Sequence, residues 1–321
     1  MNYFDLQMFA NPNTNTTGSS FLTAEMKTFY DTQLLENARN ENVFNQFGKK
    51  TALPKNGGKE VEWRRIETYA PALTPLTEGV TPDGNTAKYV AITQEIDQYG
   101  DYTTVSDRLD AEAVDPVISD ITEEHAAQAG DTLDIVTRNE VVKGTNVIYA
   151  GGKTSRATLT TADKLTPTLV NKAVTFLKKQ HAPKINGDYI AIIHPSCSFD
   201  LRESQGWLNA HEYASPEEIY NGEIGKLHGC RFVESTNQKV WVEGGKAVYA
   251  VTFMGKDAYG IIDPSAESLE VLVKPLGAGE DPLSQRATVG WKGSHAAKIL
   301  YNERLVRVEC MSEFSAEDVA N

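Results

Sequence analysis

The sequence predicts an α+β fold with parts that reach beyond one compact body. Two observations predict the mixture: apolar residues recur at helical spacing between Asp115 and Lys143, and short strand-like runs follow from residue 189 onward. A third predicts the outward reach, because residues 68–86 hold three prolines, two glycines and five threonines, which exclude a helix and a central strand. At 321 residues, the chain can bury the core of about two ordinary domains.

The N-terminal region is expected to begin as an extended arm. Residues 11–20 contain only turn and coil formers, which do not specify a regular element. From Phe21 to Phe47, apolar residues recur near helical spacing, with Thr23 able to cap the helix and Gly48 able to end it. Such a helix has an apolar face that needs a partner.

A protruding β-hairpin is expected next. Turn residues at 54–59 precede a predicted strand, Lys59–Glu67, and a second strand is predicted over Ala87–Ser106, with a bulge at Gly100. The long loop between them, residues 68–86, exceeds the usual length of a connection in a compact domain. Because two-stranded hairpins are marginal alone, we expect this one to lean on another surface.

The longest rigid element is predicted after the hairpin. Asp115 and Pro116 form an N-cap and first-turn pair, and the helix runs to Lys143 with Gly144 as its C-cap, about 42 Å long. Thr166-Pro167 opens a second helix through Gln180. The remaining expected elements are a buried strand at Tyr189–His194, short helices at Phe199–Glu203 and Pro216–Asn221, a turn at Gly225–Gly229, and strands at Cys230–Glu234, Ala247–Met254, Tyr259–Ile262, Leu269–Lys274, Arg286–Trp291, Ala296–Leu300 and Leu305–Cys310.

Composition and motifs give no catalytic, cofactor-binding or metal residue. The net charge of −13 argues against a basic surface for nucleic acid or an anionic membrane, and no apolar run reaches the length of a membrane span. We therefore expect a soluble protein, and three cysteines without zinc-site spacing indicate a reducing compartment. His194 next to Ser196 and Cys197 is interpreted as the end of a strand turning at Pro195.

The acidity is concentrated on the hairpin. Residues 59–113 carry 5 basic against 11 acidic side chains, so 6 of the 13 excess negative charges lie there. We expect these acids to meet basic groups on another copy of the chain. The candidate contact residues are Glu60, Glu62, Trp63, Glu78 and Asp83 on the hairpin, and Lys274, Arg286, Lys292, Arg304 and Arg307 on the facing subunit.

Four stretches, in their order along the chain, carry a family resemblance: Leu6–Ala10, Tyr30–Leu35, Gly225–Ser235, and Gln285–Lys292 leading into residues 296–307. With them the chain resembles the major capsid proteins of tailed bacteriophages that adopt the Hong Kong 97-type fold. It is most similar to the capsid family named after the coliphage N-four shell protein.

The resemblance implies four parts. Residues 1–50 would be the N-arm, residues 51–113 the extended β-hairpin loop, residues 114–164 with 266–321 a peripheral domain around the long spine helix, and residues 165–265 an α/β axial domain. It also implies a homo-oligomer of hexamers and pentamers in an icosahedral virion shell, made in the host bacterial cytoplasm. That shell would enclose double-stranded DNA without sequence-specific binding, with scaffolding, portal and decoration proteins as further partners and no membrane.

Two alternatives remain open. The first is an encapsulin-like shell that encloses cargo enzymes in a bacterial nanocompartment, which the contents of the particle would distinguish. The second is a soluble cytoplasmic enzyme with an α+β fold, which a stoichiometric metal or nucleotide would indicate. No catalytic constellation favours the enzyme.

Overall fold

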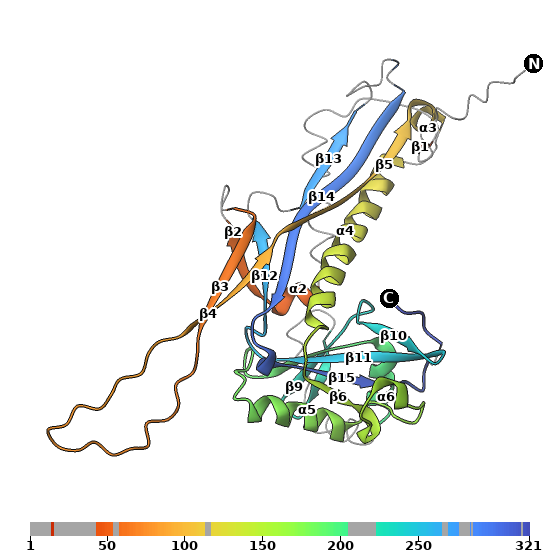
Figure 1. The fold of residues 1–321 in the computed structure, drawn as a ribbon. Coiled ribbons are helices and arrows are strands. Elements are labelled where there is room, and N and C mark those ends of the chain that lie inside the picture. The colour runs from red at the N-terminus through yellow and green to blue at the C-terminus, as the bar shows by residue number, and fades with distance from the viewer. Residues whose placement is uncertain are drawn as a thin grey trace, which may run out of the picture.

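The computed structural model describes residues 14–15, 43–53, 58–112, 117–204, 223–264, 269–275, 283, 285–315 and 317–321. The described strands form two large sheets and one two-stranded hairpin. Figure 1 shows the first sheet standing beside a long helix, the second sheet lying across the base of the molecule, and the hairpin projecting to one side. The predicted α+β mixture is confirmed.

The first sheet is built around one very long strand. Its order is β1 (Thr14–Asn15), β5 (Asp97–Ser106), β14 (Arg286–Ile299), β12 (Tyr259–Pro264) and β2 (Lys49–Leu53), and β13 (Glu270–Lys274) also pairs with β14. The prediction of separate strands at Arg286–Trp291 and Ala296–Leu300 is wrong. The intervening Lys292–His295 looks like a turn in sequence, but its backbone stays paired with β5 through the register His295↔Asp97.

Helix α4 (Val117–Val141) packs along this sheet, and its 25 residues span about 37 Å. Ala126 and Ala129 are fully buried and meet Trp291 of β14. The predicted apolar stripe is only partly correct, since Leu133 and Val136 are half-buried, whereas polar side chains fill the buried face. The buried polar residues of α4 are Thr122, His125, Asp134, Thr137 and Arg138.

The end of α4 also differs from the prediction. Gly144 does not adopt the left-handed conformation of a glycine C-cap, because it is not among the residues with positive φ. Its N–H still bonds to the carbonyl of Val141 at 3.2 Å. A Cβ at this position would lie 2.9 Å from a methyl group of Leu305, so the glycine allows the close approach of β15.

The second sheet forms the broad base. Its order is β6 (Val147–Tyr149), β15 (Leu305–Cys310), β11 (Lys246–Met254), β7 (Tyr189–Ile193), β9 (Cys230–Glu234) and β8 (Glu223–Leu227), with β10 (Val240–Glu243) beside β11. Helices α5 (Pro167–Lys179) and α6 (Pro195–Arg202) pack on it and share its largest apolar core. Strand β8 replaces most of the turn predicted at Gly225–Gly229, and only His228 and Gly229 turn.

Side-chain caps start both helices of the base. The Thr166 hydroxyl accepts the Leu169 N–H at 3.3 Å, as predicted for α5. His194 caps α6, since its Nδ1 accepts the Ser196 N–H at 3.2 Å. The helix therefore begins at Pro195, earlier than the predicted Phe199.

The hairpin consists of β3 (Glu60–Ile66) and β4 (Tyr89–Glu95), paired antiparallel from Glu60↔Glu95 to Ile66↔Tyr89. Every residue from 67 to 88 is exposed and lacks regular structure, which confirms the predicted loop. The single residue Ile96 separates β4 from β5. The expected interruption at Gly100 is wrong, because Gly100 lies within β5, where a Cβ would meet the Trp291 carbonyl oxygen at 2.5 Å.

Short elements complete the described chain: α2 (Phe44–Phe47), α3 (Asp107–Glu112), and the 3-10 turns η2 (Ala150–Gly152), η3 (Arg156–Thr158) and η4 (Asn302–Arg304). The expected helix at 21–47 lies mostly outside the described residues, as do the expected helix Pro216–Asn221 and most of the expected arm. Sheet membership also crosses the expected domain boundaries, because β6 and β15 belong to the second sheet and β12 belongs to the first.

Candidate inter-subunit contact surfaces

The base of the hairpin is anchored to the first sheet by Trp63. This side chain is 8% exposed and packs with Val61 against Ile262 and Leu300. Its indole N–H donates to the Thr51 hydroxyl at 3.0 Å. Alternation along β3 turns Trp63 toward the chain's own core, and its contact with another subunit stays a prediction.

The loop of the hairpin presents apolar side chains to solvent. Leu73 is 85% exposed, Leu76 is 78% exposed and Val80 is 62% exposed. The predicted contact residues Glu78 and Asp83 are exposed in the same loop, which Figure 1 shows extending away from both sheets. This stretch therefore combines uncovered apolar groups with negative charge at the greatest reach of the hairpin.

The acids of the hairpin stem have different surroundings. Glu62 forms an ion pair with Arg64 on the same strand. Glu60 lies opposite Glu95, whose carboxylate is 3.3 Å from the Lys59 ammonium. Like charges directly opposite each other destabilise a strand pair, so the nearby lysine offsets that repulsion. Glu60 and Glu62 are exposed, but cations of the hairpin itself already screen this part of the stem.

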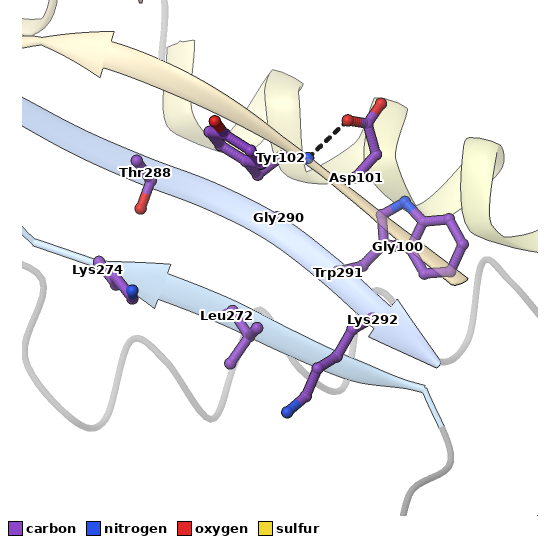
Figure 2. Close-up of a pocket in the computed structure, with 9 residues that line it drawn as sticks. All are labelled: Gly100, Asp101, Tyr102, Leu272, Lys274, Thr288, Gly290, Trp291 and Lys292. Atoms are coloured by element: carbon purple, nitrogen blue, oxygen red, sulfur yellow. Dashed lines mark hydrogen bonds between the residues drawn. The ribbon is translucent and has the colours of Figure 1, made fainter. Parts of the chain in front are cut away.

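A shallow groove of about 250 Å³ lies on the face of the first sheet turned away from α4. Trp291 points to the helix, so its neighbours Gly290 and Lys292 face the groove, opposite Tyr102 and Gly100 of β5. Figure 2 shows Lys274 and Lys292 directed to the same side of β13 and β14, away from Asp101 and Trp291. Gly100 and Gly290 thus contribute no side chains to the groove, and Lys274 and Lys292 make one edge of it basic.

Three predicted basic residues belong to this sheet. Lys274 is exposed at the end of β13, and Arg286 is exposed at the start of β14. Lys292 lies 3.1 Å from the carboxylate of Glu270, and about half of each side chain remains exposed. The structure therefore brings Lys274 and Lys292 together at one groove and places Arg286 farther along β14.

Arg304 and Arg307 lie elsewhere and are engaged within the chain. Arg304 stacks 3.8 Å from the Tyr301 ring and donates to the Lys256 carbonyl at 3.0 Å. Arg307 is 13% exposed, donates to the Val142 carbonyl, and its Nε lies 2.9 Å from Glu309. Its guanidinium neutralises a fully buried carboxylate of its own sheet, and the contact of Arg307 with another subunit stays a prediction.

One group that the sequence analysis missed joins α2, α4 and the second sheet. Asp134 is fully buried, and its Oδ1 accepts the Phe44 N–H at 2.7 Å. The side-chain amide of Asn237, which follows β9, donates to Asp134 Oδ2 at 3.4 Å. The backbone carbonyl of Asn237 accepts a hydrogen bond from the Arg138 guanidinium at 2.8 Å. Burial raises the pKa of Asp134 to about 7, although both hydrogen bonds oppose the shift.

The sequence contains a signal for Asp134. It lies four residues after Gly130 and eight after Ala126, and both of these are buried on the same face of α4. A carboxylate in that series indicates a buried acid that needs donors. The donors themselves come from distant segments, residues 44 and 237, so their identity could not be predicted.

Two further searches cover the described residues. No group of three or more His, Cys, Asp and Glu side chains there is arranged to hold a metal ion. None of the helices in the described ranges combines the length and apolar character needed to cross a membrane.

An anchored hairpin that projects an exposed apolar and acidic loop is typical of a subunit that associates with neighbours. Sequence comparison gives the family. The model of the family described as "Phage capsid protein" matches residues 65–307, so the chain belongs to that family, which is structural rather than enzymatic. It is a major capsid protein that forms the shell. No curated protein sequence matches.

Solved structures show the same fold over nearly the whole chain. The capsid of Ralstonia phage GP4 has a TM-score of 0.67 at 14% identity, covering 97% of this chain and 99% of that one. The capsid of cyanophage P-SCSP1u has a TM-score of 0.62 at 15% identity, covering 98% and 100%. The SrpI encapsulin of Synechococcus elongatus PCC 7942 has a TM-score of 0.55 at 10% identity, covering the whole of both chains.

These likenesses confirm the Hong Kong 97-type fold. The narrower assignment to the coliphage N-four family stays a prediction.

Proposed function

We propose that this capsid protein assembles as hexamers and pentamers into an icosahedral shell, made in the host bacterial cytoplasm, that encloses the double-stranded DNA of a tailed bacteriophage. The observation that carries the proposal is the exposed loop at 67–88, whose leucines no described part of the subunit covers. Apolar surface of this kind is a contact site, and repeated heterologous contacts close into a shell. The DNA is enclosed without sequence-specific binding, which suits a net charge of −13.

The loop of one subunit is proposed to meet the first sheet of its neighbour. Glu78 and Asp83 are the acids of the loop, and Lys274 and Lys292 line the groove on that sheet. The two glycines, Gly100 and Gly290, line this groove without side chains of their own. Opposite charges steer the encounter and fix its register, while buried leucines supply most of the free energy of association. Arg286 is a further candidate at the far end of β14.

We propose residues 1–50 as the N-arm, residues 51–113 as the extended loop, residues 114–164 with 266–321 as the peripheral domain, and residues 165–265 as the axial domain, with three strands reassigned. Strand pairing supports moving β6 and β15 to the axial part and β12 to the peripheral part. Scaffolding, portal and decoration proteins are proposed as additional partners of the shell.

Charge reversal tests the contact between loop and groove. We expect the double variant Glu78→Lys with Asp83→Lys to lower the yield of shells, measured by sedimentation and electron microscopy, because it places cations against Lys274 and Lys292. Adding Lys274→Glu and Lys292→Glu restores opposite signs and should recover assembly. Lys172→Glu on the exposed face of α5 and Glu243→Lys on β10 are matched controls that leave the yield unchanged.

Two results would contradict this contact. One is a fully reversed quadruple variant that assembles no better than the double variant. The other is a structure of the assembled particle in which residues 67–88 touch no neighbour.

The contents of the particle test the wider proposal. Shells purified from phage lysates should protect double-stranded DNA from nuclease. An encapsulin-like function would instead give shells that contain a cargo enzyme and no DNA, and subunits that never form shells would overturn both.

A further inference from the structure

Two of the three cysteines lie side by side in the apolar core between α6 and the second sheet. Cys197 is in the first turn of α6, Cys310 is the last residue of β15, and both are fully buried. Their sulfur atoms are 3.6 Å apart. The third, Cys230 on β9, is also buried and contacts the carbonyl of Arg231. The pair joins segments separated by more than a hundred residues of chain.

The contact between the two sulfur atoms is close to what a covalent bond needs. Sulfur atoms in a disulfide are about 2.0 Å apart, so the pair has to close by roughly 1.5 Å. Both cysteines lie at the end of an element, where a small displacement disturbs few backbone hydrogen bonds. The segment after β15 also holds α6 in place, since the Ser312 hydroxyl donates to the Ser196 carbonyl at 2.8 Å.

We propose that Cys197 and Cys310 form a redox modification site, at which a small peroxide converts the two thiols into an intramolecular disulfide between α6 and β15. One thiolate attacks the peroxide, giving a sulfenic acid and hydroxide. The second thiol displaces the sulfenic oxygen, which leaves as water. Overall, two thiols and one hydrogen peroxide give one disulfide and two waters.

The surroundings of the pair make this reaction slow. Burial raises the pKa of Cys197 well above its ordinary value, and the neighbouring carboxylates of Asp200 and Asp318 act in the same direction. Because the thiolate is the nucleophile, oxidation should accelerate as the pH rises. A subunit made in a reducing cytoplasm would keep both thiols, and the bond would form after exposure to an oxidant.

The disulfide belongs to one subunit, so it can be tested whether or not shells form. The full-length protein is treated with hydrogen peroxide, denatured, alkylated with iodoacetamide and measured by intact mass. Before alkylation, we expect a loss of about 2 Da for the disulfide. Alkylation should then modify one cysteine, Cys230, in place of the three that are free in the reduced protein. Non-reducing peptide mapping should recover a Cys197–Cys310 linkage.

Single variants give the control set. Cys230→Ser should form the bond as the wild type does, whereas Cys197→Ser and Cys310→Ser should not. The oxidised wild type should melt at least about 5 °C above the reduced form, because the bond closes a long loop. Three alkylated cysteines after peroxide treatment, mass gains from added oxygen alone, or a linkage that includes Cys230 would each overturn the proposal.

Discussion

Replacing Asp134 by Asn should remove a specific part of the pH dependence of stability. The amide keeps an oxygen that can accept the Phe44 N–H, and it has similar size, but it cannot ionise. The wild-type carboxyl is fully buried beside Asp131 and Arg138, with a pKa of about 7 against an ordinary 3.8. Its protonation is therefore coupled to folding.

The sign follows from where the proton is bound. Between pH 3.8 and about 7, the folded chain holds the Asp134 proton and the unfolded chain does not. The free energy of unfolding therefore falls as the pH rises through this window. A difference of about 3 pKa units corresponds to about 4 kcal/mol, and this part of the pH dependence is absent in the Asn variant.

His295 contributes in the opposite direction. Its Nε2 is 2.8 Å from the Thr137 hydroxyl, one helical turn from Asp134, and burial lowers its pKa to about 4 from 6.5. The unfolded chain binds the extra proton between these values, so the free energy of unfolding rises with pH there, by about 3 kcal/mol. The opposite contributions of Asp134 and His295 to the pH dependence of the free energy of unfolding therefore nearly cancel in the wild type. Substituting one residue at a time should reveal each contribution.

Urea unfolding of dissociated subunits, followed by tryptophan fluorescence from pH 4.5 to 7.5, measures both effects. The stability of Asp134→Asn minus wild type should increase with pH over this range. The corresponding difference for His295→Gln should decrease from pH 4.5 to 6.5. Stability differences that stay constant with pH, or that change in the opposite direction, would contradict a protonated Asp134 and a neutral His295 in the folded chain.

Three further substitutions have definite expected outcomes. Trp63→Ala should lower the free energy of unfolding by about 3–5 kcal/mol and speed proteolysis within residues 67–88, because the hairpin loses its anchor; unchanged proteolysis would contradict that role. Gly290→Val should lower the free energy of unfolding in urea by about 1–3 kcal/mol, because a Cβ there meets the Asp101 carbonyl oxygen at 2.6 Å and the Tyr102 side chain at 2.7 Å. A variant as stable as the wild type would mean that β5 and β14 can move apart to accommodate the side chain. Arg307→Ala should lower the free energy of unfolding of dissociated subunits by about 1–3 kcal/mol in urea, since it removes one partner of buried Glu309 while Arg156 still pairs with both carboxylate oxygens; a defect in assembly with unchanged stability would contradict this and support the predicted contact with another subunit.

Local patterns predicted the elements but not which sheet each joins. Thr166-Pro167 and the apolar run at Tyr189 predicted α5 and β7, because caps and periodicity act within a few residues. The sequence predicts two strands where the structure has β14 alone, since Gly293 resembles a strand break. In the structure, Gly293 pairs with Tyr99 of β5, so the strand continues through it. Partners distant in sequence decide such cases.

The contact candidates show the same limit. Glu78 and Asp83 were predicted to be exposed, and they are, because a loop rich in proline has nowhere to bury them. Trp63 and Arg307 are predicted contact residues too, but the structure packs both side chains within their own subunit. The spacing of Arg307 and Glu309 along one strand does place them on the same face, but no spacing in the sequence connects Trp63 with Thr51.

The single-residue junction at Ile96 couples the hairpin mechanically to the first sheet. Strand β4 continues through it into β5, which pairs with β14 from Asp97 to Ser106. A pull on the loop along the strand axis loads those hydrogen bonds in shear, so that they share the force and resist together. Tension from a neighbour that binds the loop would thus pass directly into the longest ladder among the described strands, while a sideways pull would load only the bonds at its edge.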